Sequence, residues 1–354
     1  DFLNQDEESK ILLDTARKSL IKLIHRDLKH KSEADIYLLR WGIVHLLEDD
    51  QDHQDILLSL LGNSTYIEEK YFHQKLEYLF DDLYESYLSI DDKEKSKKIL
   101  EAFLTLILNH ANHPTKIIAI EDIHALFVYR QNQSFYEDFL NYSISRLEAA
   151  QDKKNSNLYP SLLLRKGNLT RRKGRLAESQ VLLVKALKLF ESAGNLIEIE
   201  KLEYDLAYVE YLQGNTEKSI AHFEKSKQYA LQNQHEVGYW ISHCVQAHTR
   251  LFDEKNHITL QEFIDLLNEA LPYFIKNARQ GNENAKRWIK NIYQQTFLAA
   301  YESRNLVVAE DCFEKMGKNQ WIQKFDEGNL DKYKVRLYIL RDDLEGASHI
   351  FSTY

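Results

Sequence analysis

The sequence predicts an all-α fold in which antiparallel helix pairs stack into a solenoid, and three observations support this prediction. The 354 residues include only 11 glycines and 3 prolines, against a usual ~7% and ~5%, so turn residues are too few for a many-stranded sheet. Apolar residues recur at spacings of three and four along most of the chain, which is the helical period. A helical-hairpin pattern then occurs twice, 40 residues apart.

Composition narrows the class of protein. Hydrophobic residues make up 44% of the chain, enough to bury a core. The net charge of -9 argues against nucleic-acid binding through bulk charge. Cys244 and Cys312 are too few for a disulfide framework, so we expect a reducing, cytoplasmic setting. We also expect no membrane span and no signal peptide, because no apolar run approaches the length that a span needs.

The N-terminal region, residues 1–152, is predicted to be helical but without a clear repeat. Thr65 and Glu68 have the form of a capping box, and Asp92 is placed to cap the helix that follows it. The region is either a set of divergent repeats or a separate helical bundle, ending at a polar stretch, 153–157. The expected helices are 6–30, 32–47, 54–61, 65–88, 93–110, 114–130 and 134–151.

From 158 to 354 the sequence repeats. Gly174 and Gly214 each fall between two predicted helices, where a residue without a Cβ adopts a left-handed conformation at no steric cost. Small residues recur where paired helices should approach most closely. The matched positions are Gly167 with Ala207, Gly174 with Gly214, Ser179 with Ser219, Leu183 with Phe223, and Ala186 with Ser226.

Further copies follow with less regular spacing. A third contains Ala247 and an insertion of about four residues near 256–259, and a fourth contains Ala309, Phe313 and Met316. A fifth begins at Ala347 and Phe351 and stops at Tyr354. This interrupted series, together with a start at Asp1, suggests a piece of a longer protein.

The pattern resembles the tetratricopeptide repeat. Its usual unit is about 34 residues, whereas the spacing here is 40, so each helix should be nearly one turn longer. The family's Trp position falls on Leu163, and its Pro after the second helix is missing. The resemblance implies a right-handed superhelix whose concave face, lined by first helices, holds a peptide or protein segment. Long units of this kind are similar to those of bacterial peptide-pheromone receptors and of the sensor arrays of STAND-type signalling ATPases.

The resemblance also implies where a ligand would bind. Asn can bond a peptide backbone, Arg and Lys can pair with a carboxylate, and Tyr offers stacking area with a polar tip. The alternative is that the tyrosines pack between repeats and that the basic residues between Arg165 and Arg175 are a solvated helix end. The candidate site residues are Leu164, Asn168, Arg171 and Arg172 in the first clear repeat, Lys201, Tyr204, Tyr208 and Tyr211 in the second, and His248, beside Cys244 and Leu251, in the third.

No pattern in the sequence indicates catalysis. The pairs His110 with His113 and His243 with His248 lack a third ligand, so we expect neither a metal nor a cofactor. There is also no phosphate-binding Gly-rich loop. The predicted function is therefore a non-enzymatic protein- or peptide-binding scaffold or sensor in a bacterial regulatory complex. The alternative is a peptide-regulated switch whose N-terminal bundle acts on a response regulator or another effector.

Overall fold

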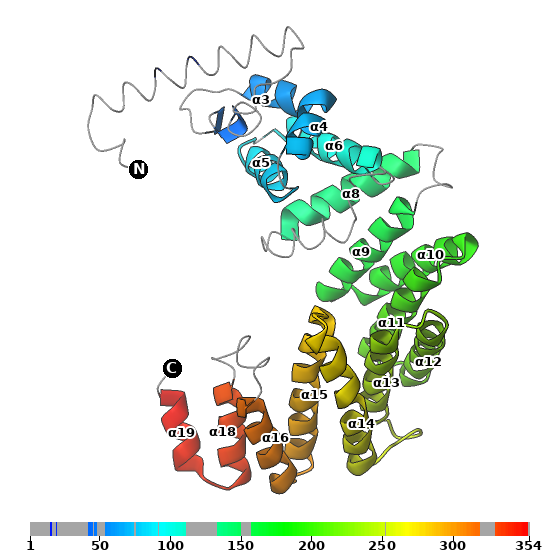
Figure 1. The fold of residues 1–354 in the computed structure, drawn as a ribbon, viewed down its shortest axis with the longest axis vertical. Helices are drawn as coiled ribbons and strands as arrows, with labels where there is room; N and C mark the ends of the chain where they lie inside the picture. Colours follow the sequence, from blue (N-terminus) through cyan, green and yellow to red (C-terminus); the bar gives the residue numbers. More distant parts are fainter. Residues whose placement is uncertain are drawn as a thin grey trace. The chain divides into compact units, whose positions relative to one another are not determined.

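The computed structural model describes residues 15, 19, 42–44, 46–47, 54–73, 76–90, 92–110, 133–149, 157–251, 253–318 and 330–352. Every regular element in these ranges is an α-helix, which confirms the predicted all-α class (Figure 1). The chain divides into two compact units, Asp1–Leu169 and Thr170–Tyr354, each of which is described separately. None of the helices described is both long enough and apolar enough to cross a membrane.

The first unit is built around one long helix, α6. The other described helices of the unit, α3, α4, α5 and α8, all pack against it. Aromatic rings fill the core: the centroids of Phe80 and Phe103 are 5.8 Å apart, and those of Phe103 and Phe139 are 5.0 Å apart. The helices are α3 (Gln54–Leu61), α4 (Ser64–His73), α5 (Leu76–Leu88), α6 (Lys93–His110) and α8 (Gln133–Ala149).

Two details of the first unit differ from the sequence prediction. The expected helix 65–88 is two helices, α4 and α5. Helix α4 begins at Ser64, before Thr65, and Asn63 caps it, because the Oδ1 of Asn63 accepts the backbone N–H of Tyr66 at 3.3 Å. The cap at Asp92 is confirmed, since its Oδ1 accepts the N–H of Glu94 at 2.8 Å. The expected helix 114–130, and most of the expected helices 6–30 and 32–47, lie outside the described residues.

A buried ion pair joins α4 to α5. The side chain of Lys70 is fully buried, and that of its partner Asp82 is only 11% exposed. Burial lowers the pKa of Lys70 and raises the pKa of Asp82, since both charges are removed from water. The neighbouring Tyr66 is buried as well, and burial together with the Asp82 charge raises the pKa of its hydroxyl.

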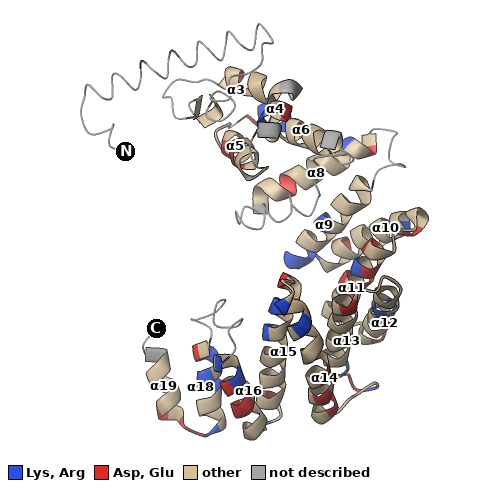
Figure 2. Ribbon diagram, viewed as in Figure 1, with Lys and Arg blue, Asp and Glu red and all other residues tan. Residues whose placement is uncertain are grey.

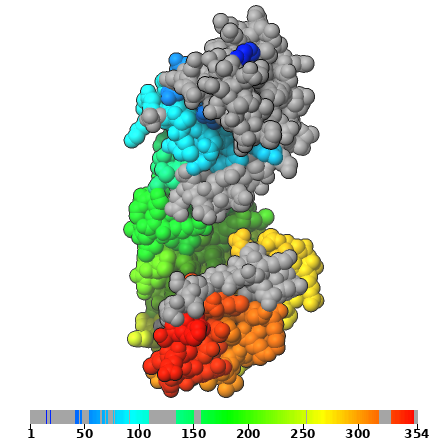
Figure 3. Space-filling view, turned by 90° about the vertical axis from the view of Figure 1, so that its left-hand side faces the viewer, coloured from blue at the N-terminus to red at the C-terminus, as the bar shows by residue number. Residues whose placement is uncertain are grey.

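The second unit is a series of helix pairs. From α10 onward, each described helix packs against the next described helix in the chain. Figure 3 shows α16, α18 and α19, in orange and red, side by side at one end of this unit. The unit begins with the last three residues of α9 (Leu158–Arg172); the first helices that follow it are α11 (Leu196–Leu212), α13 (Glu236–Leu251), α15 (Glu283–Glu302) and α18 (Leu330–Leu340), and the second helices are α10 (Leu176–Ala193), α12 (Thr216–Gln232), α14 (Leu260–Arg279), α16 (Leu306–Lys318) and α19 (Leu344–Ser352).

The division between the units falls inside α9, after Leu169. The sequence placed its break earlier, at 153–157, and residues 153–156 lie outside the described ranges. The predicted insertion before α14 is present: residues 253–259 form a non-helical loop, and Thr259 with Glu262 closes it in a capping box.

The bends between helices share one geometry. At Gly214 (φ +80°) the backbone N–H donates to Tyr211 O at 3.0 Å, and the next N–H, of Asn215, donates to Glu210 O at 2.9 Å. Gly174 (φ +76°) makes the same two bonds, so the two predicted turns are equivalent, as the repeat requires. The residues that occupy such left-handed bends are Gly174, Gly194, Gly214, Gln234, Gly281, Arg304 and Asp342.

The left-handed bend at Gly214 can be tested by an alanine substitution, with a second glycine as the control. A Cβ added at Gly214 would meet no atom within 4 Å, so Gly214→Ala tests the backbone alone. We expect this substitution to lower the free energy of unfolding by about 1 kcal/mol, because φ is positive there. Gly317→Ala also meets no atom but lies inside α16, where it should stabilise by up to about 1 kcal/mol. Denaturant unfolding followed by circular dichroism measures both; equal signs would contradict the assignment of the bend.

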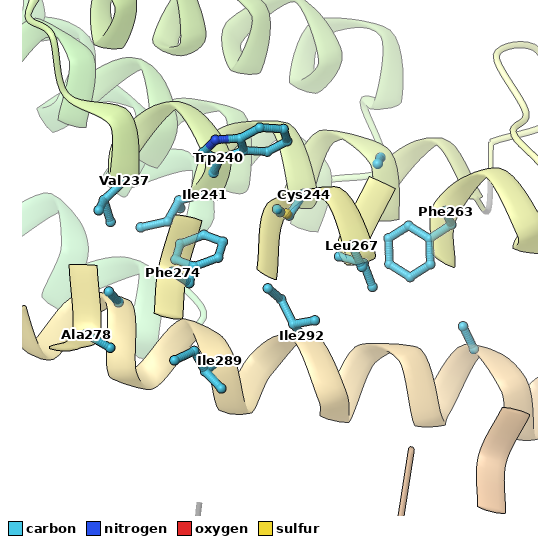
Figure 4. Close-up of a cluster of buried hydrophobic side chains, with 14 of the residues drawn as sticks. Val237, Trp240, Ile241, Cys244, Phe263, Leu267, Phe274, Ala278, Ile289 and Ile292 are labelled. Carbon is cyan, nitrogen blue, oxygen red and sulfur yellow. The ribbon is translucent and has the colours of Figure 1, made fainter. Parts of the chain in front are cut away.

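The core of the second unit confirms the positions that the repeat predicts to be buried. Leu183 and Phe223 are fully buried, as are the small residues Ser179 and Ser219. Further along, side chains from three consecutive helices interdigitate (Figure 4). The members that Figure 4 labels are Val237, Trp240, Ile241 and Cys244 from α13, Phe263, Leu267, Phe274 and Ala278 from α14, and Ile289 and Ile292 from α15.

Helix α11 carries three buried carboxylates. Glu200 accepts a hydrogen bond from Asn233 Nδ2 at 2.9 Å, and the ring Nδ1 of His235 lies 2.6 Å from its other oxygen. The second carboxylate, Glu203, pairs with His222 on α12. The third, Glu210, accepts from Gln180 on α10 at 2.6 Å and from Asn215 at 2.8 Å. Buried carboxylates need such partners, so these bonds fix how α11 sits between its neighbours.

Candidate functional site

Neighbouring first helices touch at a recurring pair of positions near their C-terminal bends. The residue three places before one bend contacts the residue six places before the next. The guanidinium of Arg171 lies 4.7 Å from the ring centroid of Tyr208, and the guanidinium of Arg336 lies 5.7 Å from the ring centroid of Tyr301. Between α11 and α13, the ring of Tyr211 lies 6.5 Å from the ring of His248, which is 40 residues after Tyr208.

We call the six residues that make these contacts the ladder. Within α11, the rings of Tyr208 and Tyr211 are 6.2 Å apart, so the first four members are continuous. All six side chains are partly exposed. The ladder consists of Arg171, Tyr208, Tyr211, His248, Tyr301 and Arg336.

The first helices face one another along the ladder. Helix α13 packs directly against α15, and α15 against α18, in addition to the contacts within each pair. The carboxylate of Glu302, at the end of α15, is close enough to Tyr211 on α11 to contribute to raising the pKa of its hydroxyl, after burial and Tyr208. We call the surface formed by the six ladder residues the ladder face.

Arg171 retains hydrogen-bonding capacity. Its guanidinium approaches the carboxylate of Asp205 at 3.8 Å, which is an ion pair but too long for a direct hydrogen bond. The two side chains are only 17% and 14% exposed. The Nε of Arg171 is buried and has no hydrogen-bond partner among the residues described. A guanidinium has five donors, and because the Nε is buried, a carboxylate or a peptide carbonyl would have to bind at the terminal N–H groups.

The imidazole of His248 is neutral at pH 7, because burial lowers its pKa below the ordinary value. Its ring also lies 5.9 Å from the ring of Phe263 in the core. His243, one turn earlier, stacks on Trp240 at 5.8 Å, and burial with the charge of Lys227 lowers its pKa to about 4. The two histidines therefore have different surroundings, and only His248 is a ladder residue.

The structure brings together four of the predicted site residues: Arg171, Tyr208, Tyr211 and His248. The others lie elsewhere. Tyr204 packs its ring 5.6 Å from Phe223 and belongs to the core, where burial raises its pKa. Lys201 is exposed and pairs with Glu198 on its own helix at 2.5 Å. Arg172 is exposed at the end of α9, where Figure 2 shows basic residues.

The remaining two candidates belong to the first unit. Leu164 is 1% exposed, so its side chain is core and cannot line a surface as the sequence predicted. Asn168 is partly buried. The basic stretch that surrounds them is not uniformly free, since Arg175 pairs with Glu178 at 3.2 Å and Arg171 with Asp205.

Sequence reasoning missed three residues: Asp205, Tyr301 and Arg336. Asp205 lies three residues before Tyr208 and therefore on the same face of α11. Tyr301 and Arg336 could have been found by counting back from their bends, but those bends contain Arg304 and Asp342 in place of glycine.

The cysteines are buried, as predicted. Burial raises the pKa of the Cys244 thiol to about 12 and that of Cys312 to about 11, so both stay protonated at neutral pH. Within the part of the chain that the structure describes, no group of three His, Cys, Asp or Glu side chains is placed to hold a metal ion. His113, one of the histidines weighed as a ligand, lies outside it.

The stacked helix pairs, their shared bends and the recurring contacts define the class: the chain is a tetratricopeptide-like helical repeat protein. No protein-family model matches the sequence, and no curated protein does. Solved structures match the fold. RapI in its apo form has a TM-score of 0.54 at 14% identity, with 96% of this chain and 86% of that one covered.

Two further structures are similar at 14% identity. The STAND protein PH0952 from Pyrococcus horikoshii, which has a tetratricopeptide repeat sensor, has a TM-score of 0.50 with 95% of this chain covered. The match covers 52% of PH0952, so the present chain spans about half of its length. BtubC from P. vanneervenii has a TM-score of 0.48, with 63% of this chain and 89% of that one covered. At this identity the likeness concerns the fold.

Proposed function

We propose that the second unit is a non-catalytic binding scaffold or sensor whose ladder face receives a peptide or an extended protein segment. The observation that carries this proposal is the ladder itself. It brings two arginines, three tyrosines and a histidine together along five first helices. The cores between α13 and α15 and between α15 and α18 are apolar, so the ladder contacts of these helices are additional to the contacts that pack them.

The chemistry of the ladder suits a polypeptide ligand. Tyrosine rings give large contact areas at small entropic cost, and arginine bonds peptide carbonyls and carboxylates. The net charge of -9 offers no bulk attraction for a nucleic-acid backbone. A sensor role agrees with the neighbour PH0952, which is described as a signal-transduction ATPase with a repeat sensor. We further propose a cytoplasmic regulatory complex as the setting, which fits the free, buried thiols.

A second candidate is the peptide-regulated switch, in which the first unit acts on an effector. One observation favours it. The first unit is compact in itself and has an open groove of about 830 Å³ between α6 and α8. Basic side chains line it, namely Lys93, Lys97 and Arg146, together with Asp138, which accepts a hydrogen bond from Tyr87 at 2.6 Å. An effector that binds the second unit alone would argue against this reading.

A peptide library tests the proposed function. A phage-displayed random dodecapeptide library would be selected against the full chain, and enriched peptides measured by fluorescence anisotropy. We expect Arg171→Ala with Tyr208→Ala to weaken binding at least about tenfold, because anchors of this kind carry most of the binding energy. Helix content should not change, since both side chains are partly exposed.

The matched control removes the same residue types away from the ladder. Arg175→Ala with Tyr229→Ala deletes an arginine that pairs with Glu178 and a tyrosine on α12. This control should bind like the unmodified chain. Failure to enrich any peptide, or equal loss in both double variants, would refute the proposal.

A further inference from the structure

The ladder has an arginine at each end and only neutral rings between them. Arg171 on α9 meets Tyr208, and Arg336 on α18 meets Tyr301. The pairs are mirror images in order: the arginine precedes its tyrosine in the first pair and follows it in the second. A ligand that follows the ladder would therefore meet a cation, then aromatic side chains, then a second cation.

The second arginine has no carboxylate partner among the described residues. Its guanidinium contacts the ring of Tyr301 and makes no ion pair there. Lys332, one turn earlier on the same face of α18, is exposed and adds to the positive charge. A cation held over a ring is oriented without being neutralised, so Arg336 is placed to pair with an incoming anion.

Two anionic side chains, Asp205 and Glu302, lie near the ladder. Asp205 forms an ion pair with Arg171 at 3.8 Å, a distance too long for a hydrogen bond, so the guanidinium still lacks a hydrogen-bonded carboxylate. Glu302 is exposed, lies near Tyr211 and directly follows Tyr301 in sequence, and no ion pair between Glu302 and Arg336 is present among the described residues. Each end of the ladder thus carries a guanidinium: that of Arg171 faces Asp205 without a hydrogen bond, and that of Arg336 lies over the ring of Tyr301.

The distance along the ladder between Arg171 and Arg336 determines how long a ligand segment must be to contact both. The ladder passes over α9, α11, α13, α15 and α18, and packed helices lie roughly 8–10 Å apart. Four such steps make a path of roughly 30–40 Å. An extended chain advances about 3.3 Å per residue, so about ten residues span this path.

We propose that the ladder binds one extended acidic segment of a partner protein at two points, one carboxylate at Arg171 and another at Arg336, about ten residues apart. This inference rests on the proposed function and adds the charge, the number of anchor points and their separation. Each anchor is a charge-assisted hydrogen bond, and joining two in one ligand raises affinity more than either alone.

Synthetic peptides test the separation. Fluorescein-labelled, C-terminally amidated peptides would carry two aspartates separated by about two, five or ten residues of alternating Ala and Pro, with one central Tyr. Anisotropy titration should show the longest spacer binding at least about tenfold more tightly than the shortest, because only it reaches both arginines. Changing its second Asp to Asn should remove the advantage.

Variants of the protein identify the second anchor. Arg336→Gln should reduce the affinity for the long peptide to that for the short one and leave the short one unchanged. Lys334→Gln removes the same charge from an exposed neighbour on another face of α18 and should change neither. Circular dichroism checks that both variants keep their helices.

The possible results separate this inference from the proposed function. Affinity independent of spacing, or a long peptide unaffected by Arg336→Gln, would overturn the two-point model. The proposed function would survive that result if library peptides still required Arg171 and Tyr208. Absence of binding by every peptide of the series would also overturn the inference, whereas the proposed function would still be judged by the library selection.

Discussion

Replacing Lys70 with methionine should destabilise the first unit by about 3–5 kcal/mol. The substitution leaves the carboxylate of Asp82 buried without its cation, and the side chain of Asp82 is only 11% exposed. Burial already raises the pKa of Asp82, and loss of Lys70 raises it further. Hydrogen exchange of the backbone amides in α4 and α5 measures the effect locally, which matters because the chain has two units.

The control for Lys70→Met is the double variant with Asp82→Leu. Replacing both charges with apolar groups of similar volume should recover most of the stability, because the desolvation cost disappears with the charges. The single variant should also recover partly at acid pH. A carboxyl whose pKa is raised on folding is costly above its unfolded pKa, and protonation removes that cost as the pH falls. A single variant as stable as the double would show that the pair is not buried.

Replacing Phe223 with alanine should lower the stability of the second unit by about 3–5 kcal/mol. Its side chain is fully buried and its ring packs against Tyr204 at 5.6 Å, so truncation leaves a cavity between α11 and α12. In a repeat array each helix pair depends on its neighbours, so exchange should rise first in α11, α12 and α13.

The matched control for Phe223→Ala is Val181→Ala on α10. Val181 is 68% exposed, and its truncation should change the free energy of unfolding by less than about 0.5 kcal/mol. Denaturant unfolding followed by circular dichroism, together with exchange mass spectrometry, measures both variants. A cost below about 1 kcal/mol for Phe223→Ala would mean that the core closes around the lost ring.

The sequence predicted the fold well where residue types report geometry. Gly174 and Gly214 mark equivalent bends because glycine favours a left-handed conformation, and Ser179 and Ser219 are small where helices meet. The later bends carried no such signal, since Arg304 adopts positive φ despite having a side chain. In the first unit, the apolar pattern runs through both α4 and α5, so the sequence alone indicated one helix.

The candidate site was predicted only in part, for a related reason. Residues up to His248 follow the 40-residue period and could be assigned by counting. The loop 253–259 and the longer helices α14 and α15 then shift the register, so that Tyr301 follows Tyr211 by 90 residues instead of 80. The sequence also did not predict which candidate side chains are buried. Leu164 occupies an expected groove position but is buried, and residue spacing alone does not show this.

The three buried carboxylates of α11 have a mechanical consequence. Helices packed through apolar side chains can shift slightly by small rotamer changes. Glu200, Glu203 and Glu210, in contrast, keep their hydrogen-bond and ion-pair partners in only one alignment of the neighbouring helices. If α11 slid along its neighbours, the buried carboxylates would lose these partners without gaining contact with water. Tyr208 and Tyr211 therefore lie on a helix that polar contacts align with its neighbours, and we expect adjustment to a bound ligand in the helices that follow it.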